Sequence, residues 1–74
     1  MSSKWSTERQ DALIVTLTNR ITGKSFRAVS QAPNTIARLS DGIVTADEVR
    51  LANMTGEQAS RLISHLQDLE LTIH

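Results

Sequence analysis

The last third of the chain carries the strongest structural signal, an apolar stripe with helical spacing. Apolar residues recur there every three or four positions, and the positions between them are polar. The stripe consists of Ala59, Leu62, Ile63, Leu66 and Leu69. Just before it, Thr55 and Gln58 have the spacing of a capping box, in which each side chain bonds the backbone amide of the other residue. The pattern predicts a helix over 56–69 with one buried face.

The rest of the chain has to supply the surface on which this helix packs, and it is short. The sequence has 74 residues, and a chain of that order buries only about 60% of the surface that it exposes when unfolded. It contains no cysteine, which excludes disulfide scaffolds, zinc ribbons and thiol catalysis and fits a reducing cytoplasm. We expect one small cytoplasmic domain, without a large enzyme's enclosed active site.

No segment of the sequence predicts contact with a membrane. The longest uninterrupted apolar run is 12–15, far below the roughly 20 residues that a spanning helix needs. The N-terminus also lacks the apolar core of a secretion signal. We therefore expect a soluble chain without a membrane partner.

The segment before Gly23 favours a β-strand. Between Leu13 and Ile21 apolar and polar residues alternate, and the stretch is rich in the β-branched residues that favour strands. A second such run follows the glycine, and a glycine-containing loop between two strand-forming runs is typical of a hairpin. We therefore predict a hairpin that pairs 12–20 with 25–30. Because positions 13, 17 and 21 also have helical spacing, a helix over 6–21 is the alternative.

The middle of the chain suggests a second hairpin. Asp41 and Gly42 form a favoured turn pair, with strand-forming residues on both sides. After it, 48–52 fits a short strand and 46–54 fits a short helix, and the alternating residues of 70–74 fit an edge strand or an irregular tail.

Together these patterns predict an α+β fold. In this fold a small antiparallel sheet of two hairpins packs against the single C-terminal amphipathic helix. The division along the chain is a flexible polar segment over 1–10 and one domain over 11–74.

The sequence contains no specific catalytic or metal-binding motif. His65 and His74 lack partners at ligand spacing, so we expect no metal and no cofactor. Asp47 and Glu48 are adjacent and therefore point to different faces of a helix or strand, which does not suit general acid and base catalysis. Gly23 to Ser25 lacks the earlier glycine of a phosphate-binding loop. We predict that the protein is not an enzyme.

The charges are separated along the chain although their sum is zero. Residues 1–38 carry six basic and two acidic residues, a net charge of +4, and 39–74 carry two basic and six acidic residues, a net charge of −4. A basic half attracts anionic partners. The residues that we predict to bind a partner are Trp5, Arg9, Arg20, Lys24 and Arg27. Arg20, Lys24 and Arg27 would meet at the tip of the first hairpin, and Trp5 is either a lid on the core or an interface anchor.

In size and charge layout the chain is similar to small bacteriophage-encoded proteins that bind host machinery such as RNA polymerase and redirect it. This analogy covers no motif. It implies a small non-enzymatic regulator that binds a larger protein complex through its basic half. We expect the chain itself to be a monomer or a weak homodimer, the latter through strand addition at an exposed edge.

The alternative function is a compact DNA-binding regulator. Residues 23–29 and 35–39 resemble the two helices of a helix-turn-helix motif in residue type. This resemblance implies a recognition element over 25–40. Its nucleic-acid contacts would be Lys24, Arg27 and Arg38. The spacing departs from the motif, because only seven positions separate Val29 from Ile36 and each helix has about two turns or fewer.

Overall fold

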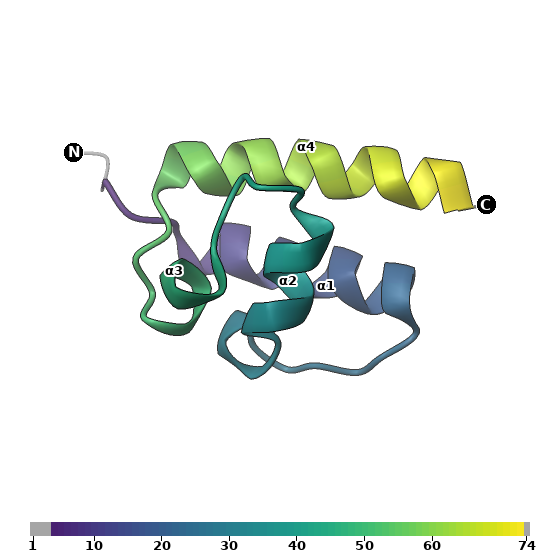
Figure 1. The fold of residues 1–74 in the computed structure, drawn as a ribbon, viewed down its shortest axis with the longest axis horizontal. Coiled ribbons are helices and arrows are strands. Elements are labelled where there is room, and N and C mark those ends of the chain that lie inside the picture. Colours follow the sequence, from purple (N-terminus) through teal and green to yellow (C-terminus); the bar gives the residue numbers. More distant parts are fainter. Residues whose placement is uncertain (1–3, 74) are drawn as a thin grey trace.

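The computed structural model describes residues 4–73, and these form helices joined by short loops (Figure 1). The elements are α1 (Glu8–Thr22), the 3-10 helix η1 (Val29–Gln31), α2 (Pro33–Leu39), α3 (Ala46–Arg50) and α4 (Gly56–Ile73). Among the described residues the only β-type pairing is an isolated antiparallel bridge between Trp5 and Thr55. The predicted α+β fold with two hairpins is therefore wrong, because the described chain is all-helical.

The two long helices, α1 and α4, lie side by side and run in the same direction (Figure 1). Near their beginnings the Gln10 side chain donates to Ser60 Oγ at 3.2 Å, and near their ends Arg20 Nη1 lies 3.7 Å from Glu70 Oε2. Both pairs join residues fifty positions apart. A residue of α1 therefore lies level with the residue of α4 whose number is greater by fifty.

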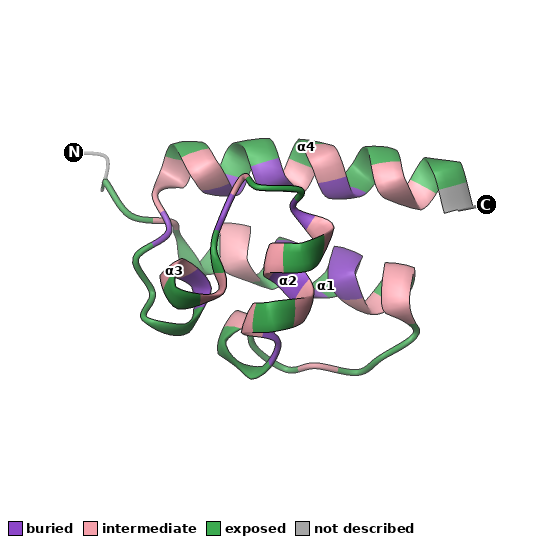
Figure 2. Ribbon diagram, in the orientation of Figure 1, coloured by how far each residue is buried: buried purple, intermediate pink, exposed green. Residues whose placement is uncertain are grey.

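The shorter elements η1, α2 and α3 pack together and cover one side of the α1–α4 pair (Figure 1). Figure 2 shows the buried residues on the sides of the helices that face this centre. The buried core takes residues from every α-helix and from the loops between them: Ile14, Leu17, Ala32, Ile36, Val44, Val49, Met54, Ala59, Leu62 and Leu66. The opposite side of the α1–α4 pair has no covering element among the described residues.

Residues 8–22 form a helix instead of the favoured strand because their buried stripe has helical spacing. Ile14, Leu17, Thr18 and Ile21 recur at intervals of three and four positions, and Thr18 is fully buried although it is polar. Packing this stripe against α4 removes several large side chains from water, at about 1.5–3 kcal/mol for each fully buried one. Strand propensities span only about 1 kcal/mol, so burial decides the structure.

The other predicted strands are also absent. Residues 24–28 form an irregular connection that leads into η1, so no second strand pairs with 12–20. Asp41 and Gly42 do form a turn, and both have positive φ angles, but the turn joins α2 to α3. For 46–54 the helical alternative is correct over Ala46–Arg50.

The predicted C-terminal helix is confirmed, and α4 continues beyond 69 to Ile73. The proposed edge strand over 70–74 is therefore wrong for its described part, and His74 lies outside the described residues. In the part of the chain that the structure describes, no helix is both long and apolar enough to cross a membrane.

Three helices begin with the same cap, and two inter-helix contacts link these caps. Thr7, Thr45 and Thr55 each accept a hydrogen bond from the third residue of the following helix, and that residue's side chain accepts one from the threonine amide. The Gln10 side chain also donates to Gly56 O of α4 at 3.2 Å. The Gln58 side chain donates to Glu48 of α3 at 2.9 Å. The beginnings of α1, α3 and α4 are thus joined at one end of the molecule.

Candidate functional site

The connection after α1 turns back along the helix and is held there by one side chain. Asn19 Nδ2 donates to Phe26 O at 2.9 Å, and the Phe26 amide donates to Asn19 Oδ1 at 2.9 Å. The Phe26 and Val29 side chains pack against the core. These contacts place residues 27–29 opposite the first half of α1, where they form the second wall of a pocket.

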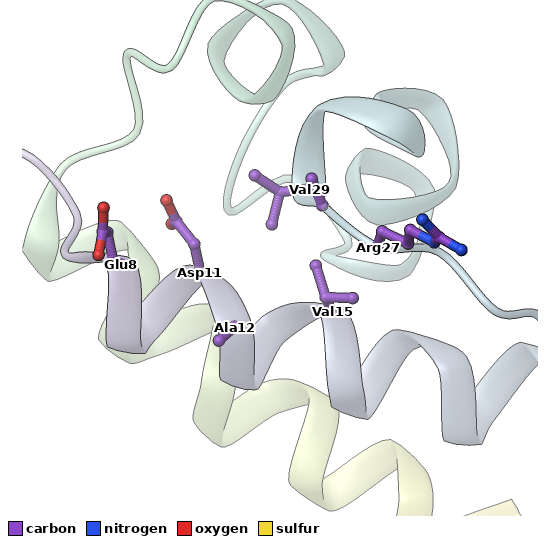
Figure 3. A pocket seen from close by; sticks show the side chains of 7 residues that line it. Glu8, Asp11, Ala12, Val15, Arg27 and Val29 are labelled. Atoms are coloured by element: carbon purple, nitrogen blue, oxygen red, sulfur yellow. The ribbon is translucent and has the colours of Figure 1, made fainter.

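This pocket is open to solvent and has a volume of about 210 Å³. Its lining combines charged residues with small apolar ones: Glu8, Asp11, Ala12 and Val15 from α1, and Arg27, Ala28 and Val29 from the connection. Figure 3 shows Glu8 and Asp11 side by side on α1, with Val15 and Val29 beyond them. The volume suits one side chain or one small ligand, since pockets for drug-sized ligands are about 300–1,000 Å³.

The two carboxylates of the pocket lack an ion-pair partner among the described residues. Glu8 and Asp11 are three positions apart and lie on one face of α1, and neither forms an ion pair among the described residues. Asp11 Oδ1 is buried and has no hydrogen-bond partner. The Arg27 side chain extends along the far rim, away from the two carboxylates (Figure 3). The inner part of the pocket is therefore negatively charged beside an apolar wall.

The structure does not bring the five predicted partner-binding residues together. Arg27 lines the pocket, and Lys24 is exposed in the same connection. Arg9 and Arg20 are exposed on α1, eleven positions apart and hence on one stripe of the helix, which lies away from the pocket-lining positions. The hairpin tip that was expected to gather Arg20, Lys24 and Arg27 does not exist in the described chain.

Trp5 lies before α1, next to the beginning of α4. It bridges Thr55, the residue is 44% exposed, and Lys4 Nζ lies 4.9 Å from the ring centre. Its neighbour Ser6 donates from its amide to Met54 O at 2.9 Å. Within the expected flexible segment, 4–6 thus pair with the backbone of 54–56, Thr7 caps α1 and 8–10 belong to α1, and residues 1–3 lie outside the described part.

The residues of the DNA-binding alternative lie on different elements. Lys24 and Arg27 belong to the connection after α1, and Arg38 lies in the last turn of α2. Residues 23–28 are not helical, so the first helix that the helix-turn-helix resemblance implies is absent. Only the second, over 35–39, falls within a helix.

Sequence reasoning missed the acidic half of the pocket. Glu8 and Asp11 were treated only as minor charges in a basic half. Their spacing of three, in the first turn after Thr7, is the signal for two carboxylates on one helix face. That signal depends on reading 8–22 as a helix. The predicted hairpin would also bring Val15 and Val29 close together, but as residues of paired strands, which leave no pocket between them.

No group of three or more histidine, cysteine, aspartate or glutamate side chains in the described chain is placed to hold a metal ion. His65 is half-buried on α4 and belongs to no such group. No protein-family model, no curated protein and no solved structure matches the chain.

Proposed function

We propose that the protein is a small non-enzymatic regulator that docks on a larger protein and receives a basic side chain of that partner in its pocket. The observation that supports this proposal is the negatively charged pocket between α1 and residues 27–29. It is open to solvent, and its lining contains neither a histidine nor a hydroxyl or thiol nucleophile. Its chemistry therefore suits recognition.

Both parts of a lysine side chain, the ammonium group and the aliphatic stem, fit the lining of the pocket. Its ammonium group would lie between Glu8 and Asp11, two carboxylates that form no ion pair with any other described residue. Its aliphatic stem would lie along Val15 and Val29 and remove apolar surface from water. Both contributions favour the bound state, because unpaired charges and exposed apolar surface are what the unbound pocket presents.

The rim of the pocket favours a particular kind of residue next to that lysine in the partner. Arg27 carries positive charge at the rim, away from the two carboxylates, and Lys24 lies three positions earlier in the same connection. A partner segment that places a carboxylate close to its lysine would satisfy both signs at once. The pattern differs from a phosphate-binding surface, which would need the basic residues without the two acids.

A small probe tests the chemistry of the pocket. Nα-acetyl-lysine methylamide should shift the amide resonances of Val15 and Val29 saturably in an NMR titration, and the uncharged norleucine analogue should not. Glu8→Gln combined with Asp11→Asn should abolish the shifts. Glu57→Gln, which removes an exposed carboxylate from α4 that does not line the pocket, should preserve them. Equal shifts from both probes would contradict the proposal.

Capture from a bacterial lysate tests the docking role. A protein retained by wild type and by Glu57→Gln, but lost with the Glu8 and Asp11 pair and reduced with Lys24→Ala plus Arg27→Ala, would support docking at this pocket. By the analogy of size and charge layout, RNA polymerase is the first candidate to identify. Retention of duplex DNA that falls steeply with salt, and is unchanged in the carboxylate variants, would instead favour the DNA-binding alternative.

A further inference from the structure

The outer side of the α1–α4 pair, opposite η1, α2 and α3, is an exposed face with charges of both signs. On α1 it carries Arg9, Leu13 and Arg20, all exposed, and Leu13 is 39% exposed. On α4 it carries Glu57 and Asp68, which are exposed as well. We define these five residues as the outer face.

The positive and negative residues of the outer face have the same spacing. Arg9 and Arg20 are eleven positions apart, as are Glu57 and Asp68. Eleven residues are about three turns, so each pair lies on one stripe of its helix and spans roughly 16 Å. The basic stripe of α1 is therefore as long as the stripe of α4 that holds the two acids, which also carries Arg61 four positions after Glu57.

The parallel register places the two stripes at matching heights. Since each α1 residue is level with the α4 residue fifty positions later, Glu57 lies about two residues before the level of Arg9, and Asp68 lies the same distance before Arg20. Two residues correspond to roughly 3 Å along a helix. An arginine side chain reaches across such an offset easily.

We propose that a second copy of this chain covers the outer face, related by a twofold axis parallel to α1 and α4. Rotation about such an axis keeps every residue at its own height and brings α1 of one copy against the outer side of α4 of the other. Arg9 then meets Glu57 of the second copy, and Arg20 meets Asp68 of the second copy. Symmetry repeats both contacts, which makes four ion pairs.

Small side chains leave room for this approach. Between the charged positions α4 carries Ser60 and Ser64, both exposed and level with the region around Leu13 of α1. Leu13 of one copy can therefore enter the space over these serines as the helices come together. The contacts between copies compete with two intramolecular ion pairs. Glu57 with Arg61 is exposed at both ends, and Arg20, which is 61% exposed, lies 3.7 Å from Glu70, so both pairs exchange at little cost.

The pocket lies on another side of α1, so self-association and lysine binding are separable. The outer-face inference does not depend on the proposed function, and each can fail alone. Because exposed ion pairs are individually weak, we expect association that depends on protein concentration.

Sedimentation of charge-reversed variants tests the inference. At a concentration where wild type is mainly dimeric, Arg9→Glu and Glu57→Arg should each be monomeric, with association weakened at least tenfold. An equimolar mixture of these two variants should recover the dimer, because each mixed pair then joins opposite charges at both sites. Arg38→Glu, which makes the same charge change on α2, should remain dimeric like wild type. Circular dichroism confirms that each variant is folded.

Three results would overturn the inference. They are a wild type that stays monomeric throughout the concentration series, a dimer that tolerates Arg9→Glu, and a mixture of the two variants that remains monomeric.

Discussion

The two ends of the α1–α4 pair are held together in different ways. At the beginning, the Gly56 amide donates to Lys4 O at 3.0 Å and the Ser6 amide donates to Met54 O, with the Gln10 side chain bonded across the helices as well. At the other end, the polar contact between the helices is the ion pair of exposed Arg20 with half-buried Glu70, 3.7 Å apart. Directional hydrogen bonds hold one end, and a weak charge contact holds the other.

This difference assigns a role to each end. The beginning fixes the register of the two helices and ties in α3 through Gln58 and Glu48. A region that is held by fewer hydrogen bonds opens locally at a lower cost in free energy. The end of α1, from which the basic connection with Lys24 and Arg27 departs, is therefore the end that opens more easily.

Leu66→Ala should have the largest effect, because Leu66 is fully buried between the helices and serves both ends. A buried leucine replaced by alanine costs about 2–5 kcal/mol, which is enough to unfold a domain of this size. Chemical denaturation measures the loss. Leu71→Ala, an exposed leucine of the same helix, is the control and should change stability by less than about 0.5 kcal/mol. Similar losses in both variants would mean that α4 does not pack as described.

Gln10→Ala should come second, at about 1–2 kcal/mol, because one side chain makes contacts of two kinds. It completes the cap of α1 with Thr7 and donates to Gly56 and Ser60 of α4. Gln67→Ala, at an exposed α4 position, should be nearly neutral. Hydrogen exchange should show faster opening of the first turns of both helices in the Gln10 variant. Unchanged exchange there would contradict the role of this end in fixing the register.

Gly23→Ala should cost about 1 kcal/mol at the opposite end. Gly23 ends α1 with a φ of 74°, and an added Cβ meets nothing within 4 Å, so the cost is one of backbone strain alone. Gly56 lies in the first turn of α4 without a positive φ, and its nearest Cβ contact is 3.7 Å. Gly56→Ala should therefore be tolerated. Comparing the thermal unfolding of both variants separates the cost of the backbone conformation from the cost of steric crowding by the added Cβ.

The acid sensitivity of the hydrogen-bonded end should be smaller still. The hydrogen bond from Gln58, with that from the Thr45 amide, lowers the pKa of Glu48 below its ordinary value of 4.5. A lowered pKa in the folded state stabilises the fold above the ordinary value, and this contribution is lost as pH falls through the folded pKa. Glu48→Gln should flatten the decline in unfolding free energy below pH 4.5. Parallel pH curves for wild type and variant would contradict this linkage.

How much the sequence could predict differs between the two long helices. The stripe of α4 is apolar throughout and follows a capping box, so its period is unambiguous. In α1 the buried stripe includes Thr18, and the apolar residue at its edge, Leu13, is exposed, which makes alternation look as good as helical spacing. Thr7 and Gln10 repeat the cap of α4, and this repetition is the local signal that identifies α1.

The pocket could not be predicted for a different reason. Its two walls, the first half of α1 and residues 27–29, are brought together by the Asn19 side chain, which bonds both backbone groups of Phe26, and by the packing of Phe26 and Val29 against the core. Nothing in the local pattern of Asn19 marks such a contact. The separation of charge along the chain also gave a misleading map, since the parallel helices bring Arg20 of the basic half to Glu70 of the acidic half.

The smallest effect should come from Glu70→Gln, the change that isolates the weak end. Arg20 is largely exposed and its nitrogen lies 3.7 Å from Glu70 Oε2, so solvent screens the attraction, while that oxygen is buried and has no hydrogen-bond partner. The amide keeps the shape and removes a charge that is only partly compensated, so we expect a change within about 0.5 kcal/mol in either direction. Denaturation beside Gln10→Ala gives the comparison directly. If the two variants lose equal stability, the ion pair stabilises the contact between the helices as much as the capping network does. The end that opens more easily is then not the one that carries the basic connection.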